Sequence, residues 1–165
     1  MGHEPKVVPF PRRAASTDKV TLGGLVDSAS VSLSLYGADL EPAVVTQLLG
    51  VEPTRAWRRG ERPKPRLPPT GMGTWSLAVT GAAPQGPEEL LIGLLDRLPA
   101  DPDVWAEVRR RWKARLFFGL FLDAFNRGFN LGAGTVARVA VLGIPLHFDI
   151  YGAGECPLPF PFGDR

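Results

Sequence analysis

The alternation of apolar and polar residues predicts several β-strands. In the run SVSLSLYG, residues 30–37, polar and apolar residues alternate, which is the pattern of a strand with one buried face. The same alternation occurs at 73–81 and at 146–151, and a basic run at 54–60 is expected to pair antiparallel with 73–81. In the last strand, the side chains expected to face the core are Leu146, Phe148 and Ile150.

Apolar residues at helical spacing separate these strands. The pattern predicts helices over 39–49, 87–98, 101–114 and 133–142, with a cap at Asp101 and left-handed stops at the glycines that follow the first and last of them. A further run, 115–125, is apolar on both faces, which predicts a central strand that is covered on both sides or twisted at its glycine.

Together these elements predict an α+β fold. We expect an antiparallel β-sheet with three to four helices packed mainly on one face, built from two β-α-β-like halves. Residues 30–152 are predicted to form a single domain. Residues 1–29 are expected to be a flexible arm, and residues 153–165 a Pro-rich tail, because proline, glycine and charge replace the apolar periodicity there.

Composition limits the class of protein and the cellular compartment that the sequence is consistent with. The 165-residue chain is 44% hydrophobic and 22% charged, as expected of one globular domain rather than a disordered chain. Its single cysteine, Cys156, cannot form an internal disulfide. The sequence has no leader pattern and no apolar run of the roughly 18 residues that a membrane span needs, so we expect a cytoplasmic protein that does not enter the membrane.

Positive charge is concentrated in two segments, although the net charge is only +2. Residues 54–66 hold six basic side chains and one acid, residues 107–115 hold five and one, and each segment carries a tryptophan. The remainder of the chain is acidic. Such a distribution indicates either two solvated faces or a surface that attracts an anionic partner.

The first basic segment supplies the candidate binding site. A tryptophan beside arginines can stack on a ring while the guanidinium groups hold phosphate or carboxylate. The alternative is that Trp57 and Trp75 pack together across a strand pair and the arginines are solvated. The candidate ligand- or partner-binding residues are Arg55, Trp57, Arg58, Arg59, Arg62 and Trp75.

An alternative polar site is predicted on the last strand. His147, Asp149 and Tyr151 share its outward face, where they could meet Asp123 and Asn126 from a neighbouring strand. A proton-transfer site and an ordinary hydrogen-bonded sheet edge are both consistent with this pattern.

No further motif indicates catalysis, a cofactor or a metal. The run GAGTVA, 132–137, matches the glycine spacing of a dinucleotide loop, but too few strands accompany it, so turn glycines that open a helix explain it better. Metal binding would need more than one cysteine and two distant histidines. We therefore predict no catalytic residues, no cofactor and no metal.

Three stretches resemble the bacterial family catalogued as domain of unknown function 4279. They are LEPAVVTQLLGVEPTRAWRRGE, GTWSL and FNLGAGTVARVAVLGIPLHFDIYG, and the resemblance covers about residues 30–152. It implies the same α+β fold and a structural turn shared by Trp57 and Gly60. Because the activity of that family is unknown, the resemblance implies no reaction.

The leading functional hypothesis is a non-enzymatic binding or interaction module, such as an immunity or accessory protein. Its basic Trp/Arg face would bind an acidic protein or another anionic ligand. The alternatives are a small enzyme that uses the Asp149/Tyr151/His147 face and nucleotide or nucleic-acid binding through the arginines, with nucleic acid disfavoured by the acidic remainder of the chain. The sequence does not specify the partner, the oligomeric state or the role of the Pro-rich loop 63–69.

Overall fold

The computed structural model describes residues 24–64, 66, 68–124 and 126–152. The predicted tail, 153–165, and most of the predicted arm therefore lie outside the described residues. The arm was predicted to extend to residue 29, and within that range the structure has a short strand at Gly24–Leu25 and the start of a longer strand at Ser28.

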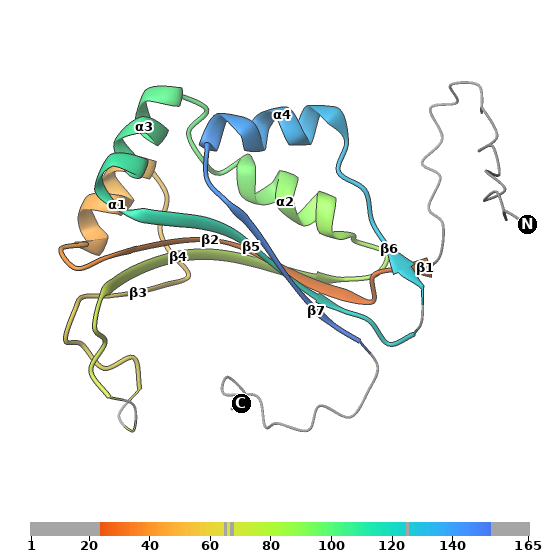
Figure 1. Ribbon diagram of the computed structural model, residues 1–165, viewed down its shortest axis with the longest axis horizontal. Helices are drawn as coiled ribbons and strands as arrows, with labels where there is room; N and C mark the ends of the chain where they lie inside the picture. The colour runs from red at the N-terminus through yellow and green to blue at the C-terminus, as the bar shows by residue number, and fades with distance from the viewer. Residues whose placement is uncertain (1–23, 65, 67, 125, 153–165) are drawn as a thin grey trace, which may run out of the picture.

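The centre of the fold is a five-stranded sheet with the strand order β3-β4-β2-β5-β7 (Figure 1). Three of its neighbouring pairs are antiparallel, as predicted. β5 and β7 are parallel, because the helix α4 (Ala133–Leu142) carries the chain back across the sheet between them. The strands are β2 (Ser28–Gly37), β3 (Arg55–Trp57), β4 (Gly73–Ala82), β5 (Lys113–Phe121) and β7 (Leu146–Tyr151).

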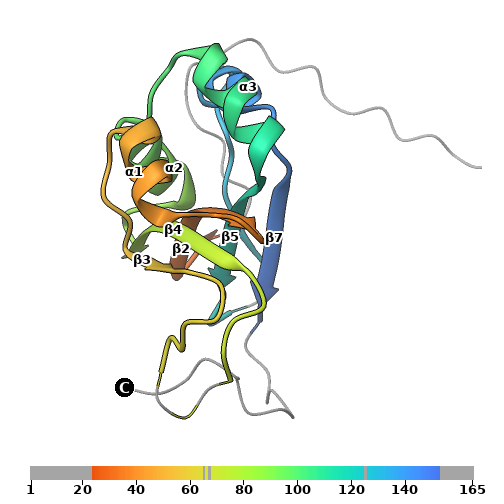
Figure 2. The ribbon, with the colours of Figure 1, turned by 90° about the vertical axis from the view of Figure 1, so that its left-hand side faces the viewer.

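The helices of the described part of the chain form a second layer on one face of this sheet (Figures 1 and 2). The predicted α+β class, with helices on a single face, is confirmed. The helices are α1 (Pro42–Leu49), α2 (Pro87–Leu95), α3 (Pro102–Arg111) and α4 (Ala133–Leu142), and two short strands, β1 (Gly24–Leu25) and β6 (Arg127–Gly128), pair beside the main sheet. None of these helices is long and apolar enough to cross a membrane.

Local signals explain where the helices begin and end. Asp101 caps α3, accepting a hydrogen bond from the Asp103 N–H at 2.9 Å, as predicted. Gly50 and Gly143 end α1 and α4 in the left-handed region, with φ of 68° and 59°. The predicted first helix begins later than expected, at Pro42, because the residues before it form a turn after β2.

The hydrophobic core lies between the helix layer and the sheet. Alternate residues of β2, β4 and β5 point into it, including Leu33, Leu77 and Leu116, which are fully buried in neighbouring positions of one row. The helices contribute Leu91, Leu94, Trp105 and Val108. Burial of this apolar surface provides the main stabilisation of the fold.

Two expectations about burial are corrected by the position of the sheet beneath a single helix layer. Of the two interpretations of the run 115–125, cover on both sides does not hold in the described part of the chain, where no helix lies on the second face of β5 and its Phe117 is half-buried. The three apolar residues of β7 point to the helix side, as predicted, but remain 37–63% exposed. Because the helices cover a single face and the middle of the sheet, both the opposite face and the β7 edge stay accessible (Figure 2).

Candidate functional site: the open face of the sheet

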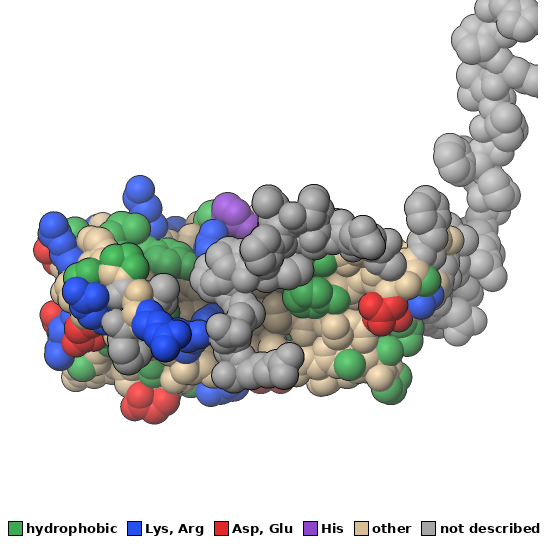
Figure 3. Space-filling view, turned by 90° about the horizontal axis from the view of Figure 1, so that it is seen from below, with side chains coloured by type: hydrophobic (Ala, Val, Ile, Leu, Met, Phe, Trp, Pro, Cys, Tyr) green, Lys and Arg blue, Asp and Glu red, His purple; other side chains and the backbone are tan. Residues whose placement is uncertain are grey.

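The open face of the sheet is hollowed into a groove of about 580 Å³. Figure 3 looks onto this face and shows Lys and Arg side chains gathered toward the end where β3 lies. We call this hollow the sheet groove. All five strands contribute to its lining, and the residues on which the argument depends are Ser34, Tyr36, Arg55, Trp57, Ser76 and Arg115.

One row across the strands forms the centre of the groove. The strand register places Arg55 on β3 opposite Ser76 on β4, Ser76 opposite Ser34 on β2, and Ser34 opposite Arg115 on β5. The two serine hydroxyls are buried and hydrogen-bond to each other at 3.0 Å between their Oγ atoms. With about 4.8 Å between neighbouring strands, the two arginine Cα atoms lie roughly 14 Å apart, with the serine pair between them.

The Arg115 guanidinium is held by aromatic side chains rather than by a carboxylate. Its Nη2 donates a hydrogen bond to the Tyr36 hydroxyl at 3.1 Å. Its Cζ lies 5.4 Å from the centre of the Tyr36 ring and 5.5 Å from that of Phe117, distances at which a cation is attracted to an aromatic face. Its Nε is buried and has no hydrogen-bond partner in the described part of the protein. A half-buried guanidinium that has no carboxylate partner among the described residues can bind an anion through its accessible nitrogen atoms.

A second row places aromatic groups beside this pair of arginines. Trp57 on β3 is opposite Thr74 on β4, which in turn is opposite Tyr36 on β2. Trp57 is half-buried and lines the groove. The groove therefore combines cationic groups with apolar ring surface, and a ligand with both features would fit it.

The far wall of the groove is formed by the polar face of β7. His147, Asp149 and Tyr151 all line it, as the alternation of the strand predicted. The Tyr151 hydroxyl donates to Asp149 Oδ2 at 3.3 Å, whereas His147 makes no hydrogen bond to either of them in the described structure. Residues of both predicted sites therefore line one groove: Arg55 and Trp57 from the first, and His147, Asp149 and Tyr151 from the second.

The expected neighbours of this polar face lie elsewhere. Asp123 follows the end of β5, where its backbone N–H donates to Asp27 Oδ2 at 2.9 Å, and it does not line the groove. Asn126 occupies the turn before β6 with a positive φ of 62°. Both belong to the connection after the strand, because β5 ends at Phe121 rather than continuing to residue 125.

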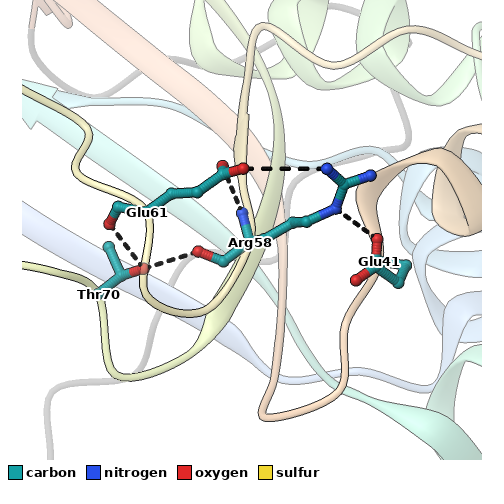
Figure 4. A network of polar contacts seen from close by, with 4 residues as sticks. All are labelled: Glu41, Arg58, Glu61 and Thr70. Carbon is teal, nitrogen blue, oxygen red and sulfur yellow. Dashed lines mark hydrogen bonds and ion pairs between the residues drawn. The ribbon is translucent and has the colours of Figure 1, made fainter.

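Arg58 is held in a structural turn (Figure 4). Its Nε donates to Glu41 Oε2 at 2.6 Å, and its backbone N–H donates to Glu61 Oε2 at 2.8 Å. The Thr70 hydroxyl donates to the Arg58 carbonyl at 2.9 Å, and Gly60 turns the chain with a φ of 84°. The hydrogen bond and charge of Glu41 raise the pKa of Arg58 further above its usual range. This turn is the structural role that the family resemblance implied for the segment.

The remaining candidates of the first basic segment do not reach the groove. Arg59 and Arg62 are exposed residues of the same turn. Trp75 is fully buried on the opposite, helix-covered face, where its Nε1–H donates to Thr46 Oγ1 at 3.1 Å. The predicted packing of Trp57 against Trp75 is therefore wrong, because Trp75 is opposite Ala56 and the two tryptophans lie on different faces.

Most of the second basic segment is also used internally. Arg109 Nη1 donates to the Leu142 carbonyl at the end of α4, at 2.6 Å, and Arg110 pairs with Glu107 at 2.7 Å. Arg111 stacks over the Trp112 ring at 4.4 Å. Among the described basic side chains of the two segments, those of Arg55 and Arg115 line the sheet groove. Arg115 was not among the predicted site residues, because its place opposite Ser34 follows from the strand register and not from its own segment.

The glycine-rich run before α4 has a structural partner of its own. The Glu88 carboxylate, buried at 8% exposure, accepts hydrogen bonds from the Gly132 N–H at 2.5 Å and from the Thr135 hydroxyl at 2.9 Å. A carboxylate of this chain therefore occupies the helix N-terminus that a dinucleotide would need. The interpretation of these glycines as turn residues agrees with this geometry.

Comparison with known proteins identifies a family and no individual relative. No curated protein and no solved structure matches the chain. A family model matches residues 27–153, which include the whole five-stranded sheet and all four helices described above. That model is described as a domain of unknown function, DUF4279, so the resemblance found in the sequence is confirmed and the chain belongs to the DUF4279 family.

Proposed function

We propose that this domain is a non-enzymatic binding module that holds acidic side chains of a partner protein in the sheet groove. The single observation that carries the proposal is the row Arg55–Ser76–Ser34–Arg115, in which two arginines without carboxylate partners among the described residues flank a polar floor. An accessory or immunity protein, which acts by covering part of its partner, would use such a surface.

The charge and geometry of the groove favour a carboxylate ligand. Guanidinium groups form strong, charge-assisted hydrogen bonds with carboxylates. The Asp149 carboxylate is on β7, two strands away from the serine pair, so the centre of the groove is positively charged. The two arginines, roughly 14 Å apart at their Cα atoms, can hold two acidic side chains of one extended segment, since side chains on the same face of a strand are about 6.6 Å apart.

The aromatic groups add affinity that charge alone does not supply. Trp57, Tyr36 and Phe117 present ring surface at the groove. Aromatic and arginine side chains are the groups that most often dominate the energy of protein interfaces. An acidic segment with an apolar or aromatic residue beside its carboxylates is therefore the expected ligand.

A peptide-binding experiment tests this proposal. The probes are a fluorescently labelled peptide rich in glutamate and aromatic residues, and the same peptide with glutamine in place of glutamate. We expect the acidic peptide alone to bind, and its affinity to fall as salt is added, because ions screen the attraction. Fluorescence polarisation over a concentration series gives the dissociation constants.

Matched substitutions locate the binding site. Arg55→Gln and Arg115→Gln should each weaken binding of the acidic peptide by about tenfold or more, the loss expected for one charge-assisted hydrogen bond. Arg97→Gln removes the same charge from an exposed position outside the groove and should leave affinity within about twofold. Equal effects of all three substitutions, or equal binding of the two peptides, would contradict the proposal.

A further inference from the structure

The edge strand β7 is a second surface that the proposed function does not use. It forms one border of the five-stranded sheet, and its only neighbour in the described structure is β5. Three large apolar side chains lie along it with much of their surface exposed: Leu146 at 37%, Phe148 at 43% and Ile150 at 63%. Exposed apolar side chains on an open edge strand are a template for pairing with another strand.

The opposite border of the sheet shows how edges are normally protected. β3 is only three residues long, carries Arg55 and leads directly into the Arg58 turn. Short length and positive charge are both known to prevent edge-to-edge pairing. β7 is six residues long and has no lysine, arginine, proline or bulge, so it lacks these protections.

The backbone of β7 has its free groups at the same three residues. The Pro145 carbonyl, just before β7, accepts a hydrogen bond from the Leu116 N–H of β5 at 3.0 Å, and the Tyr151 carbonyl accepts one at 2.8 Å from the N–H of Leu122, the residue after β5. Since N–H and C=O groups change side at each residue of a strand, the odd-numbered residues point to β5. The N–H and C=O groups of 146, 148 and 150 therefore point outward, away from the sheet.

We propose that β7 pairs antiparallel with β7 of a second copy of this chain, with Phe148 on the two-fold axis. In this register, the outward N–H and C=O groups of the two strands meet in hydrogen-bonded pairs. Leu146 lies opposite Ile150 of the second copy, and Phe148 lies opposite its own counterpart. On the other face, His147 lies opposite Asp149 of the second copy, and the same pair occurs twice because the interface is symmetric.

Charge and side-chain pattern select this register over its neighbours. A shift by one residue would place the apolar face of one strand against the polar face of the other. A shift by two residues in one direction places Asp149 opposite Asp149, and in the other direction it places His147 opposite His147. Two carboxylates directly opposite each other destabilise a strand pair, and two facing histidines lack a carboxylate partner. A histidine opposite a carboxylate can donate a hydrogen bond to it.

The expected dimer is weak and joins the two grooves. A contact made by one six-residue strand belongs to the small interfaces, so the dimer should dissociate on dilution. Because His147 and Asp149 line the sheet groove, pairing at β7 would bring the open faces of two copies together into one continuous surface. Dimerisation would then present two copies of the arginine row to one partner.

Disulfide trapping tests the register directly. In a full-length Cys156→Ser background, which removes the one native cysteine, Phe148→Cys should form a cross-linked dimer under mild oxidation. Paired residues on such strands have Cα atoms about 5.5 Å apart, within the range that a disulfide spans. Ile150→Cys alone should not cross-link, because the two copies of that residue lie on opposite sides of the two-fold axis.

Phe148 stacks on Phe118, with 4.8 Å between the ring centroids, and Phe148→Cys removes this contact. A mixture of two other variants therefore provides a second cross-linking test that keeps Phe148. Leu146→Cys mixed with Ile150→Cys should cross-link, while neither should do so alone. Absence of a cross-link in the mixture would overturn the proposal, and so would an equally fast cross-link of Ile150→Cys with itself.

Sedimentation analysis of the full chain tests the association itself. The mass of the unmodified protein should rise with concentration from 17.8 kDa toward twice that value. Ile150→Lys should weaken the dimer by at least about tenfold, which corresponds to 1.4 kcal/mol. Met72→Lys, which places the same charge on a similarly exposed residue beside β4, should not weaken it. A monomer at every concentration would refute self-pairing, whatever else covers the edge.

Discussion

Arg115 has its position fixed by contacts within the chain. The Tyr36 hydroxyl and the rings of Tyr36 and Phe117 hold the guanidinium, so little side-chain freedom is lost when an anion binds. Lysine could not replace it, because an ammonium group offers neither the planar surface that lies against the rings nor a fixed set of donors. Arginine at this position therefore provides a fixed planar group in addition to its charge.

The serine pair beneath the arginines leads to a prediction about stability. Ser34 and Ser76 share one hydrogen bond between their hydroxyl groups in a buried position. Ser34→Ala should lower the free energy of unfolding by about 1–3 kcal/mol, because it leaves the Ser76 hydroxyl without its partner. The double variant Ser34→Ala/Ser76→Ala should be no less stable than the single variant, since no orphaned group remains. Urea denaturation followed by tryptophan fluorescence measures all three proteins.

The comparison of single and double variants is its own control. If the two substitutions lower stability additively, each hydroxyl has an independent partner and the pair is not a closed unit. In that case the polar floor of the groove would differ from the one described here.

At the scale of elements, Asp27 fastens the start of β2 to the connection between β5 and α4. Its carboxylate accepts hydrogen bonds from Arg127 Nε at 2.8 Å and from Arg127 Nη2 at 3.1 Å, and Asp123 N–H donates to the same group at 2.9 Å. These hydrogen bonds, first of all that of Arg127, lower the pKa of Asp27 below its ordinary value of 3.8. The contact joins residues that are far apart in the sequence but adjacent at one end of the sheet.

This lowered pKa predicts how stability depends on pH. Because the folded-state pKa lies below the unfolded value of 3.8, the contribution of Asp27 is present above that pH and is lost as the pH falls through the lowered pKa. Asp27→Asn should therefore be less stable than the unmodified protein near neutral pH, and the difference should shrink on acidification. Thermal unfolding measured at a series of pH values between neutral and strongly acidic gives the comparison.

Arg127→Gln removes the other partner of the same contact and provides a second test. Like Asp27→Asn, this variant should lose less stability than the unmodified protein when the pH falls. The effect should be smaller than that of Asp27→Asn, because the Asp123 N–H still donates to Asp27. A stability difference between Asp27→Asn and the unmodified protein that stays constant from neutral to acid pH would show that this carboxylate does not titrate as described.

At the scale of the whole molecule, the layers could be predicted from the sequence, but the site only in part. Alternation in 30–37 and helical spacing in the segments between strands identified the elements, because an element with one buried face has apolar residues at regular intervals. Contiguous arginines such as Arg58 and Arg59 were also predicted to belong to the binding site. Contiguity is a poor guide here, because Arg58 and Arg59 follow the end of β3 at Trp57 and lie in the turn, outside the groove.

The groove depends on strand order and register, which no single segment records. Arg55 and Arg115 come from different basic segments. They lie in one row of the sheet because β4 and β2 pair with each other and with the strands that carry the two arginines. Likewise, the alternation in β7 correctly assigned Phe148 to the helix side but not its exposure, since a central strand and an edge strand can share the same pattern. Tertiary position therefore decides the function of residues whose local structure is predictable.

The most direct test of the central claim, that the arginine row of the open face binds acidic segments, is a backbone NMR titration of the full-length protein with the glutamate-rich peptide. We predict that the largest amide shift changes occur on β2, β4 and β5 around Ser34, Ser76 and Arg115, and that the glutamine peptide leaves these amides unchanged. Changes confined to the Arg58 turn or to the helix layer would contradict the account.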